Sequence, residues 1–116
     1  MTTETCLFCR IASAELPATI VYKDEQVTAF RDINPAGPTH VLIIPNRHIA
    51  SINEAVPGDE ALLGHLLLTA RKIAEMESLT ENGYRLIVNT GVHGNQTVKH
   101  LHLHVIGGQP MKYPMG

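Results

Sequence analysis

The sequence predicts an α+β domain in which a five-stranded antiparallel meander sheet is covered on one side by one short and one long helix. Three observations favour this class. Apolar residues recur at helical spacing in two segments, and five other runs are rich in β-branched and aromatic residues. These elements follow one another as helix, three strands, helix and two strands, without an internal repeat. The length of 116 residues suits one core, so we expect a single domain over residues 1–116.

The first half of the chain contains the short helix and three strands. Residues 6–14 are expected to form the helix, because apolar side chains recur there at helical spacing and a proline follows. The runs 19–23 and 27–31 are separated by three polar residues and predict a hairpin. A loop rich in turn residues then leads into the third strand at 39–44.

The second half contains the long helix and two strands. Residues 59–79 have acidic residues at their start and one apolar face, which predicts an amphipathic helix. The pair Asn82-Gly83 indicates where that helix stops. Residues 84–89 and 98–106 predict the fourth and fifth strands, and the loop 90–97 lies between them.

Composition and charge exclude several classes of partner. A hydrophobic share of 44% with 17% charged residues is typical of a globular chain. The net charge is −2 and the basic residues are scattered, so neither nucleic acid nor an anionic membrane is expected as a partner. The N-terminus lacks the pattern of a secretory signal, and the apolar runs are too short to cross a bilayer. We therefore expect a cytoplasmic protein.

Histidines occupy every second position in the run His100-Leu-His102-Leu-His104. In a strand, alternate residues share a face, so the three imidazoles are expected on one face and the leucines on the other. A lone histidine in a strand is usually a half-buried packing residue, but three on one face favour a site. Only His102 is flanked on both sides. A neutral imidazole is a competent nucleophile, and a neighbouring one can supply a proton. The pattern favours His102 as nucleophile and His104 as acid.

The loop before this run has the groups that a phosphate needs. It offers the amides of Asn89 and Asn95, the hydroxyl of Thr97, and backbone amides that two glycines leave accessible. Such residues are also common in ordinary loops. Their position beside the histidines is what favours a phosphate site.

The two cysteines, Cys6 and Cys9, have the spacing C-x-x-C. In a reducing compartment this spacing indicates metal binding or redox chemistry more often than a structural disulfide. A redox pair is expected at the start of a helix within a βαβ unit, and the sequence shows no such unit.

The run from His100 to Ile106 resembles the His-φ-His-φ-His-φ-φ motif of the histidine triad (HIT) superfamily. The similarity extends to Phe30-Arg-Asp-Ile-Asn-Pro, to Pro38-Thr-His-Val-Leu-Ile-Ile-Pro and to Gly83-Tyr-Arg-Leu-Ile-Val-Asn. The ending 107–116 resembles the Hint branch. This resemblance implies a HIT-like fold and a homodimer in which two five-stranded sheets join into one of ten strands.

The resemblance also implies an activity. Members of the branch cleave the P–N bond of adenosine or guanosine 5′-phosphoramidates, and acyl-adenylates, through a nucleotidyl-histidine, and release AMP or GMP. His102 matches the nucleophile, and His104 matches the residue that contacts phosphate and helps the leaving group. His40 and His100 match further histidines of the site, and Asp32 matches the carboxylate that binds the ribose hydroxyls.

Two larger sets of residues follow from the same resemblance. The first is an apolar pocket around the purine: Leu7, Phe8, Ile11, Phe30, Ile33 and Leu42. The second is a phosphate cradle: Asn89, Asn95, Thr97 and Val98.

Some HIT proteins bind zinc through a cysteine pair and two histidines. Cys6, Cys9, His48 and His100 match those ligands. Four protein ligands fill a tetrahedral zinc site and leave no position for water, so the zinc is expected to be structural. No organic cofactor is expected.

Three alternatives remain at this stage. Within the family, hydrolysis of dinucleoside polyphosphates is a rival that the short ending argues against. A metallohydrolase would hold a catalytic metal on the alternating histidines, and chelation would abolish its turnover. A nucleotide-binding regulatory module would bind tightly with negligible turnover.

Overall fold

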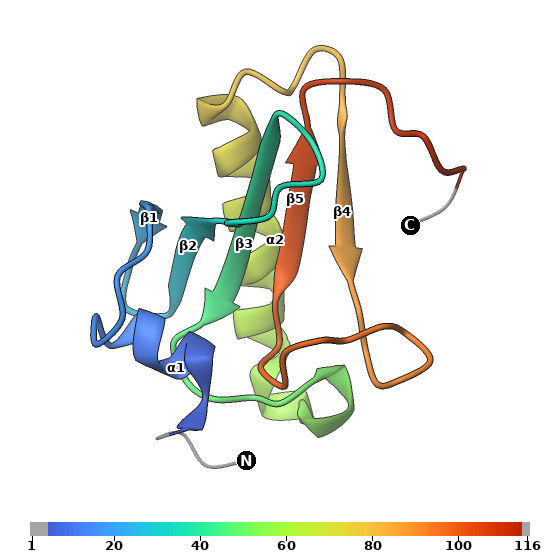
Figure 1. Ribbon diagram of the computed structural model, residues 1–116. Coiled ribbons are helices and arrows are strands. Elements are labelled where there is room, and N and C mark those ends of the chain that lie inside the picture. Colours follow the sequence, from blue (N-terminus) through green and yellow to red (C-terminus); the bar gives the residue numbers. More distant parts are fainter. Residues whose placement is uncertain (1–4, 115–116) are drawn as a thin grey trace.

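The computed structural model describes residues 5–114, and the ends of the predicted domain, 1–4 and 115–116, lie outside this range. In chain order the elements are α1 (Leu7–Ala12), β1 (Ile20–Lys23), β2 (Val27–Arg31), β3 (Thr39–Pro45), α2 (Glu60–Met76), β4 (Tyr84–Val88) and β5 (Leu103–Gly107) (Figure 1). Two 3-10 turns, Ile52–Glu54 and Pro57–Asp59, precede α2. No helix within 5–114 has the length and apolar content needed to span a bilayer.

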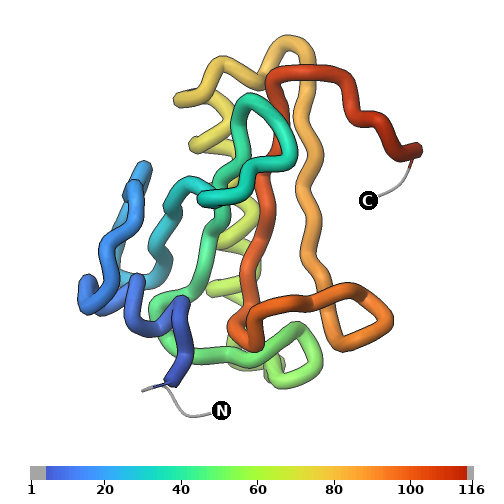
Figure 2. Tube along the Cα trace, viewed as in Figure 1, coloured from blue at the N-terminus to red at the C-terminus, as the bar shows by residue number. Residues whose placement is uncertain are grey.

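The five strands form one antiparallel sheet, as predicted, in the order β1-β2-β3-β5-β4. The first three strands are a meander, but β5 lies between β3 and β4, so the strand order is not sequential throughout. The chain crosses from β3 through α2 to the edge of the sheet before β5 returns to the centre (Figure 2). The central position buries β5: four of its five residues are buried, whereas β4 at the edge of the sheet has none.

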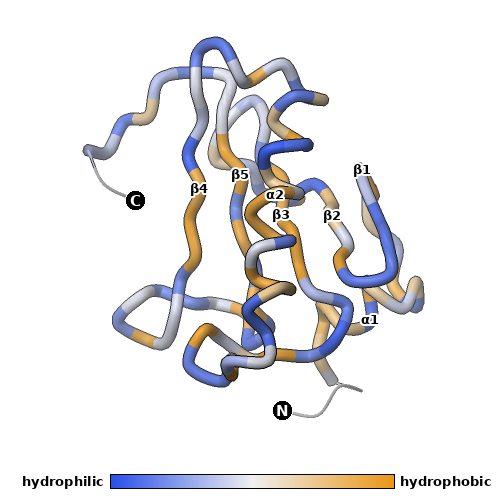
Figure 3. Tube along the Cα trace, turned by 180° about the vertical axis from the view of Figure 1, so that it is seen from behind, coloured by the Kyte–Doolittle hydropathy of each residue, from blue (hydrophilic) through white to orange (hydrophobic). Residues whose placement is uncertain are grey.

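The two helices cover opposite faces of the sheet, so the prediction that both cover one side is wrong. Val41 and Ile43 of β3 belong to the core beneath α2. Leu42 belongs to a second core with Phe8 of α1. Figure 1 shows α1 in front of the sheet and α2 behind it, and hydrophobic stretches run along β3 and β4 in the view from behind (Figure 3). The reason is that β3 is buried at every position, and a strand buried on both faces needs a cover on each.

The fifth strand begins at Leu103 and not at residue 98, because the backbone bends at 98–100. Leu101 donates its backbone N–H to the carbonyl of Ile49, at 2.7 Å. The alternation of side chains nevertheless continues through this segment. Leu101 and Leu103 join the core beneath α2, and His102 contacts Phe8 of α1.

The long helix ends at Met76, before the predicted stop at Asn82-Gly83. Ser78 has a φ of 59° and takes the left-handed position that follows many helix ends. Leu79 donates its N–H to Ala74 at 2.8 Å, and Ser78 donates to Glu75 at 3.2 Å, which is a Schellman motif. The left-handed residue is a serine, so the sequence carries no glycine signal at this position.

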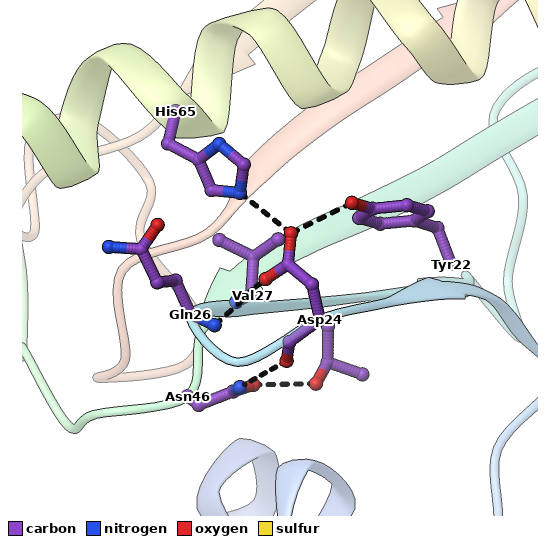
Figure 4. A network of polar contacts seen from close by, with 7 residues as sticks. Tyr22, Asp24, Gln26, Val27, Asn46 and His65 are labelled. Atoms are coloured by element: carbon purple, nitrogen blue, oxygen red, sulfur yellow. Dashed lines mark hydrogen bonds and ion pairs between the residues drawn. The ribbon is translucent and has the colours of Figure 1, made fainter.

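A polar network at the β1–β2 turn joins the sheet to α2 (Figure 4). The carboxylate of Asp24 accepts hydrogen bonds from the backbone N–H groups of Gln26 and Val27, both at 2.8 Å. Its other oxygen accepts from the Tyr22 hydroxyl at 2.8 Å and from His65 Nε2 at 2.7 Å. Burial alone would raise the pKa of Asp24, but these hydrogen bonds hold it well below its usual range.

An Asp24→Asn variant is expected to lower the free energy of unfolding by about 2 kcal/mol at pH 7, because an amide oxygen replaces fewer of these bonds. The folded pKa of Asp24 lies below the unfolded value of about 3.9. Its stabilisation is therefore present above that value and lost as the pH falls through the folded pKa. Urea titrations should show the difference between wild type and variant closing below about pH 4. Glu25→Gln, at an exposed position of the same turn, is the control, and an equal loss there would contradict the assignment.

Candidate active site

His102 and His104 lie side by side on the face of the sheet that α1 covers. Their ring centroids are 5.0 Å apart, and the ring of Phe8 packs edge-on against His102 at 5.2 Å. His102 is buried, and His104 is half-buried in β5 between β3 and β4. The central position of β5 therefore brings the second and third histidines of the run together.

Hydrogen bonding fixes the tautomer of His102. Its Nδ1 lies 2.7 Å from the carbonyl oxygen of His100. A carbonyl oxygen only accepts, so Nδ1 carries the proton and donates it. The lone pair of the neutral ring is consequently on Nε2, which has no hydrogen-bond partner within the described residues. This is the arrangement that a nucleophilic imidazole requires.

A second chain of hydrogen bonds fixes His40 and His104. The backbone N–H of Ala36 donates to His40 Nδ1 at 3.0 Å, so the proton of the neutral ring is on Nε2. That Nε2–H donates to His104 Nδ1 at 2.9 Å. The proton of a neutral His104 is therefore on its own Nε2. The Nε2–H group of His104 is thus a hydrogen-bond donor in the ring next to His102, whose Nε2 lone pair is free.

Burial keeps these imidazoles neutral. It lowers the pKa of His102. Burial, and then repulsion from the positive charge that His102 or His40 carries when protonated, lowers the pKa of His104 to about 4. Burial also lowers the pKa of His40, although Asp32 acts in the opposite direction. At neutral pH the nucleophilic form of His102 is the dominant one.

The two histidines open into a cavity of about 520 Å³ between α1 and the sheet. Phe8 and Phe30 meet edge to face in its wall, with ring centroids 5.4 Å apart. The structure brings nine residues of the predicted purine, ribose and phosphate sets to this wall: Leu7, Phe8, Ile11, Phe30, Asp32, Ile33, Leu42, Thr97 and Val98. A cavity of this size and apolar character suits a nucleoside.

Asp32 is the only acidic side chain among the described residues that line this cavity. Its Oδ1 accepts a hydrogen bond from the backbone N–H of Asn34 at 2.8 Å, and its Oδ2 lies 3.5 Å from His40 Nε2. The turn holds the carboxylate in place and leaves lone pairs for a ligand. Asp32, His40 and His104 are close enough to hold a metal ion, but the His40–His104 hydrogen bond uses the lone pair on His104 Nδ1.

The structure does not place Asn89 and Asn95 in the cavity wall. The side-chain amide of Asn89 donates to the carbonyl of Gly94 at 2.8 Å and so braces the loop from within. Asn95 has a φ of 61°, a left-handed conformation that asparagine tolerates. A contact of either residue with phosphate stays a prediction.

A second cluster lies where α1 meets the start of the histidine run. One ligand atom from each of Cys6, Cys9, His48 and His100 lies within 4.8 Å of the others. Cys6 Sγ is 3.3 Å from His100 Nδ1, and Cys9 Sγ is 3.2 Å from His48 Nδ1. His100 donates its Nε2–H to the carbonyl of Pro45 at 2.8 Å, so its Nδ1 lone pair faces the two sulfurs.

The donor set of this cluster fits a metal ion. Burial, and then the neighbouring Cys6 thiol, raise the pKa of Cys9 to about 12. A pair of thiolates at this position therefore requires a cation. Two sulfur and two imidazole ligands are what Zn²⁺ prefers in a tetrahedral site.

The comparison with known families agrees with this geometry. A family model described as the HIT domain matches residues 13–111. The chain belongs to the HIT family. The matched range begins after Cys9, so the cysteine pair lies outside the part that the HIT model covers.

Individual HIT relatives resemble nearly the whole chain. A protein of Escherichia coli K12 named purine nucleoside phosphoramidase is 50% identical over 108 residues, 93% of this chain and 91% of that protein. The crystal structure of a HIT family hydrolase from Legionella pneumophila superposes with a TM-score of 0.94 at 51% identity, covering 97% of this chain and 100% of the other. A zinc-bound histidine triad protein from Mycobacterium smegmatis superposes with a TM-score of 0.83 at 29% identity, covering 96% and 80%.

Some residues of this HIT cavity were missed by the sequence reasoning. They are Leu16, Pro17, Ala18, Arg31 and Asn34. The first three belong to the connection after α1, where no periodic pattern indicates a wall. Asn34 had a signal, because an aspartate commonly forms a turn in which its carboxylate accepts from the backbone N–H two residues later, as Asp32 does here from Asn34.

Proposed function

We propose that this HIT chain hydrolyses the P–N bond of purine nucleoside 5′-phosphoramidates, and the corresponding bond of acyl-adenylates, and releases AMP or GMP. The observation that carries the proposal is the tautomer of His102, whose Nδ1–H is held by the His100 carbonyl while Nε2 is free. The likeness to a protein named purine nucleoside phosphoramidase supports the choice of substrate.

In the proposed complex the nucleoside occupies the cavity. Phe8, Phe30 and the other apolar side chains enclose the base, and the Asp32 carboxylate accepts hydrogen bonds from the ribose hydroxyls. The α-phosphate lies against His102 and His104, near the Thr97 hydroxyl. Binding of the remote nucleoside thus aligns phosphorus with Nε2.

The reaction then proceeds in two displacements. The Nε2 lone pair of His102 attacks phosphorus, the P–N bond breaks, and its electron pair leaves with nitrogen. Water next attacks the nucleotidyl-histidine, the new N–P bond breaks, and AMP and neutral His102 are regenerated.

His104 serves the leaving group in this scheme. Its Nε2 points a hydrogen-bond donor at the site, because its Nδ1 accepts from His40. The negative charge of a bound phosphate favours the protonated form of a nearby imidazole, and in that form His104 carries protons on both nitrogens and no longer accepts from His40. His104 can therefore carry the proton that the departing nitrogen takes up and recover one from the attacking water.

We further propose that Cys6, Cys9, His48 and His100 hold a structural zinc ion, which would supply a closed tetrahedral crosslink there. Cys6 is the N-cap of α1 and Cys9 lies in that helix, while His48 comes from the loop after β3 and His100 from the segment before β5. His100 also provides the carbonyl that orients His102. The cluster would thus position the nucleophile through His100.

The proposed activity is tested by following AMP release from adenosine 5′-phosphoramidate with purified protein. Turnover that persists after chelation, as long as the chain stays folded, is expected. Loss of turnover on chelation without unfolding would favour the metallohydrolase alternative. Tight AMP binding without release of product would favour a nucleotide-binding module.

An Asp32→Asn variant is expected to lose selectivity for ribose. Because an amide presents one acceptor where the carboxylate presents two charged oxygens, kcat/KM for the ribonucleotide substrate should fall about tenfold. With a substrate that lacks both ribose hydroxyls, wild type and variant should differ much less. Equal losses on both substrates would contradict a ribose contact.

We propose a homodimer that forms through the β4 edge of the sheet. Within the described residues β4 pairs only with β5, so its other edge is open (Figure 1). Val88 of β4 is 41% exposed and lines an apolar groove with Leu67 of α2, which is 54% exposed. An open edge beside an apolar groove is a surface that a second copy can cover.

A Val88→Glu variant is therefore expected to be monomeric, with half the mass of the wild type in sedimentation equilibrium at micromolar concentration. The matched control is Leu68→Glu, which adds the same charge at an exposed α2 residue that does not line the groove. A monomeric wild type, or an equal effect of both variants, would contradict this interface.

A further inference from the structure

A smaller cavity, of about 350 Å³, adjoins the nucleoside cavity. Its wall consists of Thr5, Leu7, Thr97, Val98 and Lys99. Leu7, Thr97 and Val98 also belong to the wall of the larger cavity, which contains His102 and His104. The two cavities therefore meet at the loop that immediately precedes the histidine run. We call the smaller one the Lys99 cavity.

The Lys99 cavity carries an uncompensated positive charge. Lys99 is exposed, and no hydrogen bond or ion pair engages it within residues 5–114. The other cation at the two cavities is Arg31, and both of its terminal nitrogens are bound to the Glu77 carboxylate at 2.7 and 3.0 Å. Of the two cations that line these two adjoining cavities, Lys99 is the one without a partner among residues 5–114.

We propose that the Lys99 cavity binds the leaving group, and that Lys99 selects amines that carry a carboxylate, such as an amino acid joined to phosphorus through its α-nitrogen. The inference rests on the proposed hydrolysis of P–N bonds. If the nucleoside occupies the larger cavity and phosphorus lies at His102, the substituent on nitrogen can extend past the shared wall. The adjoining space is the Lys99 cavity.

The composition of this wall favours an amino acid over a polyphosphate. Leu7 and Val98 can contact an apolar side chain, and Lys99 can pair with one carboxylate. A polyphosphate chain carries several charges, which one lysine does not neutralise. An exposed pair of opposite charges at about 4 Å is worth roughly fivefold in an equilibrium constant. We expect a selectivity of this size, sensitive to salt.

The test compares two substrates that differ only in charge: the adenosine 5′-phosphoramidate of alanine and that of alaninamide. The measured quantity is the ratio of kcat/KM for the first to that for the second. Lys99→Gln is expected to lower this ratio about fivefold, and Lys99→Glu to lower it further, while Lys99→Arg keeps it. High salt should lower the wild-type ratio and leave that of Lys99→Gln nearly constant.

Lys72→Gln is the matched control, because it removes the same charge from α2 on the opposite face of the sheet. A ratio that is the same in wild type, Lys99→Gln and Lys99→Glu would overturn the inference and leave the proposed function standing. Equal reductions in Lys99→Gln and Lys72→Gln would also overturn it, since the effect would then be one of net charge. A wild type that releases AMP from adenosine 5′-phosphoramidate but from neither alanine substrate would overturn the inference alone. Release from none of the three would overturn the proposed function as well.

Discussion

A His102→Ala variant is expected to release AMP from adenosine 5′-phosphoramidate at least about 10⁴-fold more slowly than the wild type, because it removes the atom that attacks phosphorus. His104 cannot replace it, since its Nδ1 lone pair is bonded to His40 and its Nε2 carries the proton. Binding of AMP should persist, because the nucleoside wall is otherwise unchanged. The measurement is steady-state turnover beside equilibrium binding of AMP.

Two further experiments separate loss of the nucleophile from loss of structure. His93→Ala replaces a histidine on an exposed loop and should keep the wild-type rate. Added imidazole should restore part of the activity of His102→Ala, since the deletion leaves space beside Phe8 for a free nucleophile. A His102→Ala protein that keeps more than a tenth of the rate would exclude His102 as the nucleophile.

Removing the proposed zinc ion is expected to produce the largest change in stability. A ligand that binds only the folded state at a thousandfold excess over its Kd stabilises that state by about 4 kcal/mol. Dialysis against a strong chelator should therefore lower the free energy of unfolding by about this amount. The protein as purified should contain one zinc per chain. Cys9→Ser should lose the metal, and the His93→Ala control should keep it.

The rate of the metal-free protein distinguishes a structural ion from a catalytic one. Zinc would act on His102 only through His100. The turnover of the fraction that stays folded without metal should therefore fall by no more than about a hundredfold relative to the untreated protein. Complete loss of turnover with an intact fold would contradict the structural assignment. Two results together would contradict the site itself: purified protein that contains no metal, and a denaturant midpoint that chelation leaves unchanged.

The elements of the fold could be predicted from the sequence, but their arrangement was predicted less well. Local sequence patterns identify a strand but do not show which strands it pairs with. Nothing in residues 84–88 therefore indicated that β4 would be an edge strand, next to β5. The two-faced burial of β3 did have a signal. Its run Val-Leu-Ile-Ile is continuously apolar, which is typical of a strand covered on both faces. A run of this kind predicts helices on opposite faces of the sheet.

For the candidate site, the alternation of the histidines correctly predicted that they lie on one face, although the predicted start of the fifth strand was not exact. An extended chain keeps its two-residue period after the ladder hydrogen bonds end, so His102 lies on the side of α1 although β5 begins at Leu103. The hydrogen bonds that set each tautomer could not be predicted. They involve carbonyls and amides, at His100, Pro45 and Ala36, that every sequence contains and only the fold selects.

The most direct test of the account is the intact mass of the protein mixed with adenosine 5′-phosphoramidate and quenched in alkali, where a phosphoramidate-linked adduct survives. The account predicts one added nucleotidyl group on the wild-type chain and none on His102→Ala, together with AMP release by the wild type alone. AMP release without any adduct, or an adduct that persists in His102→Ala, would contradict a mechanism through His102.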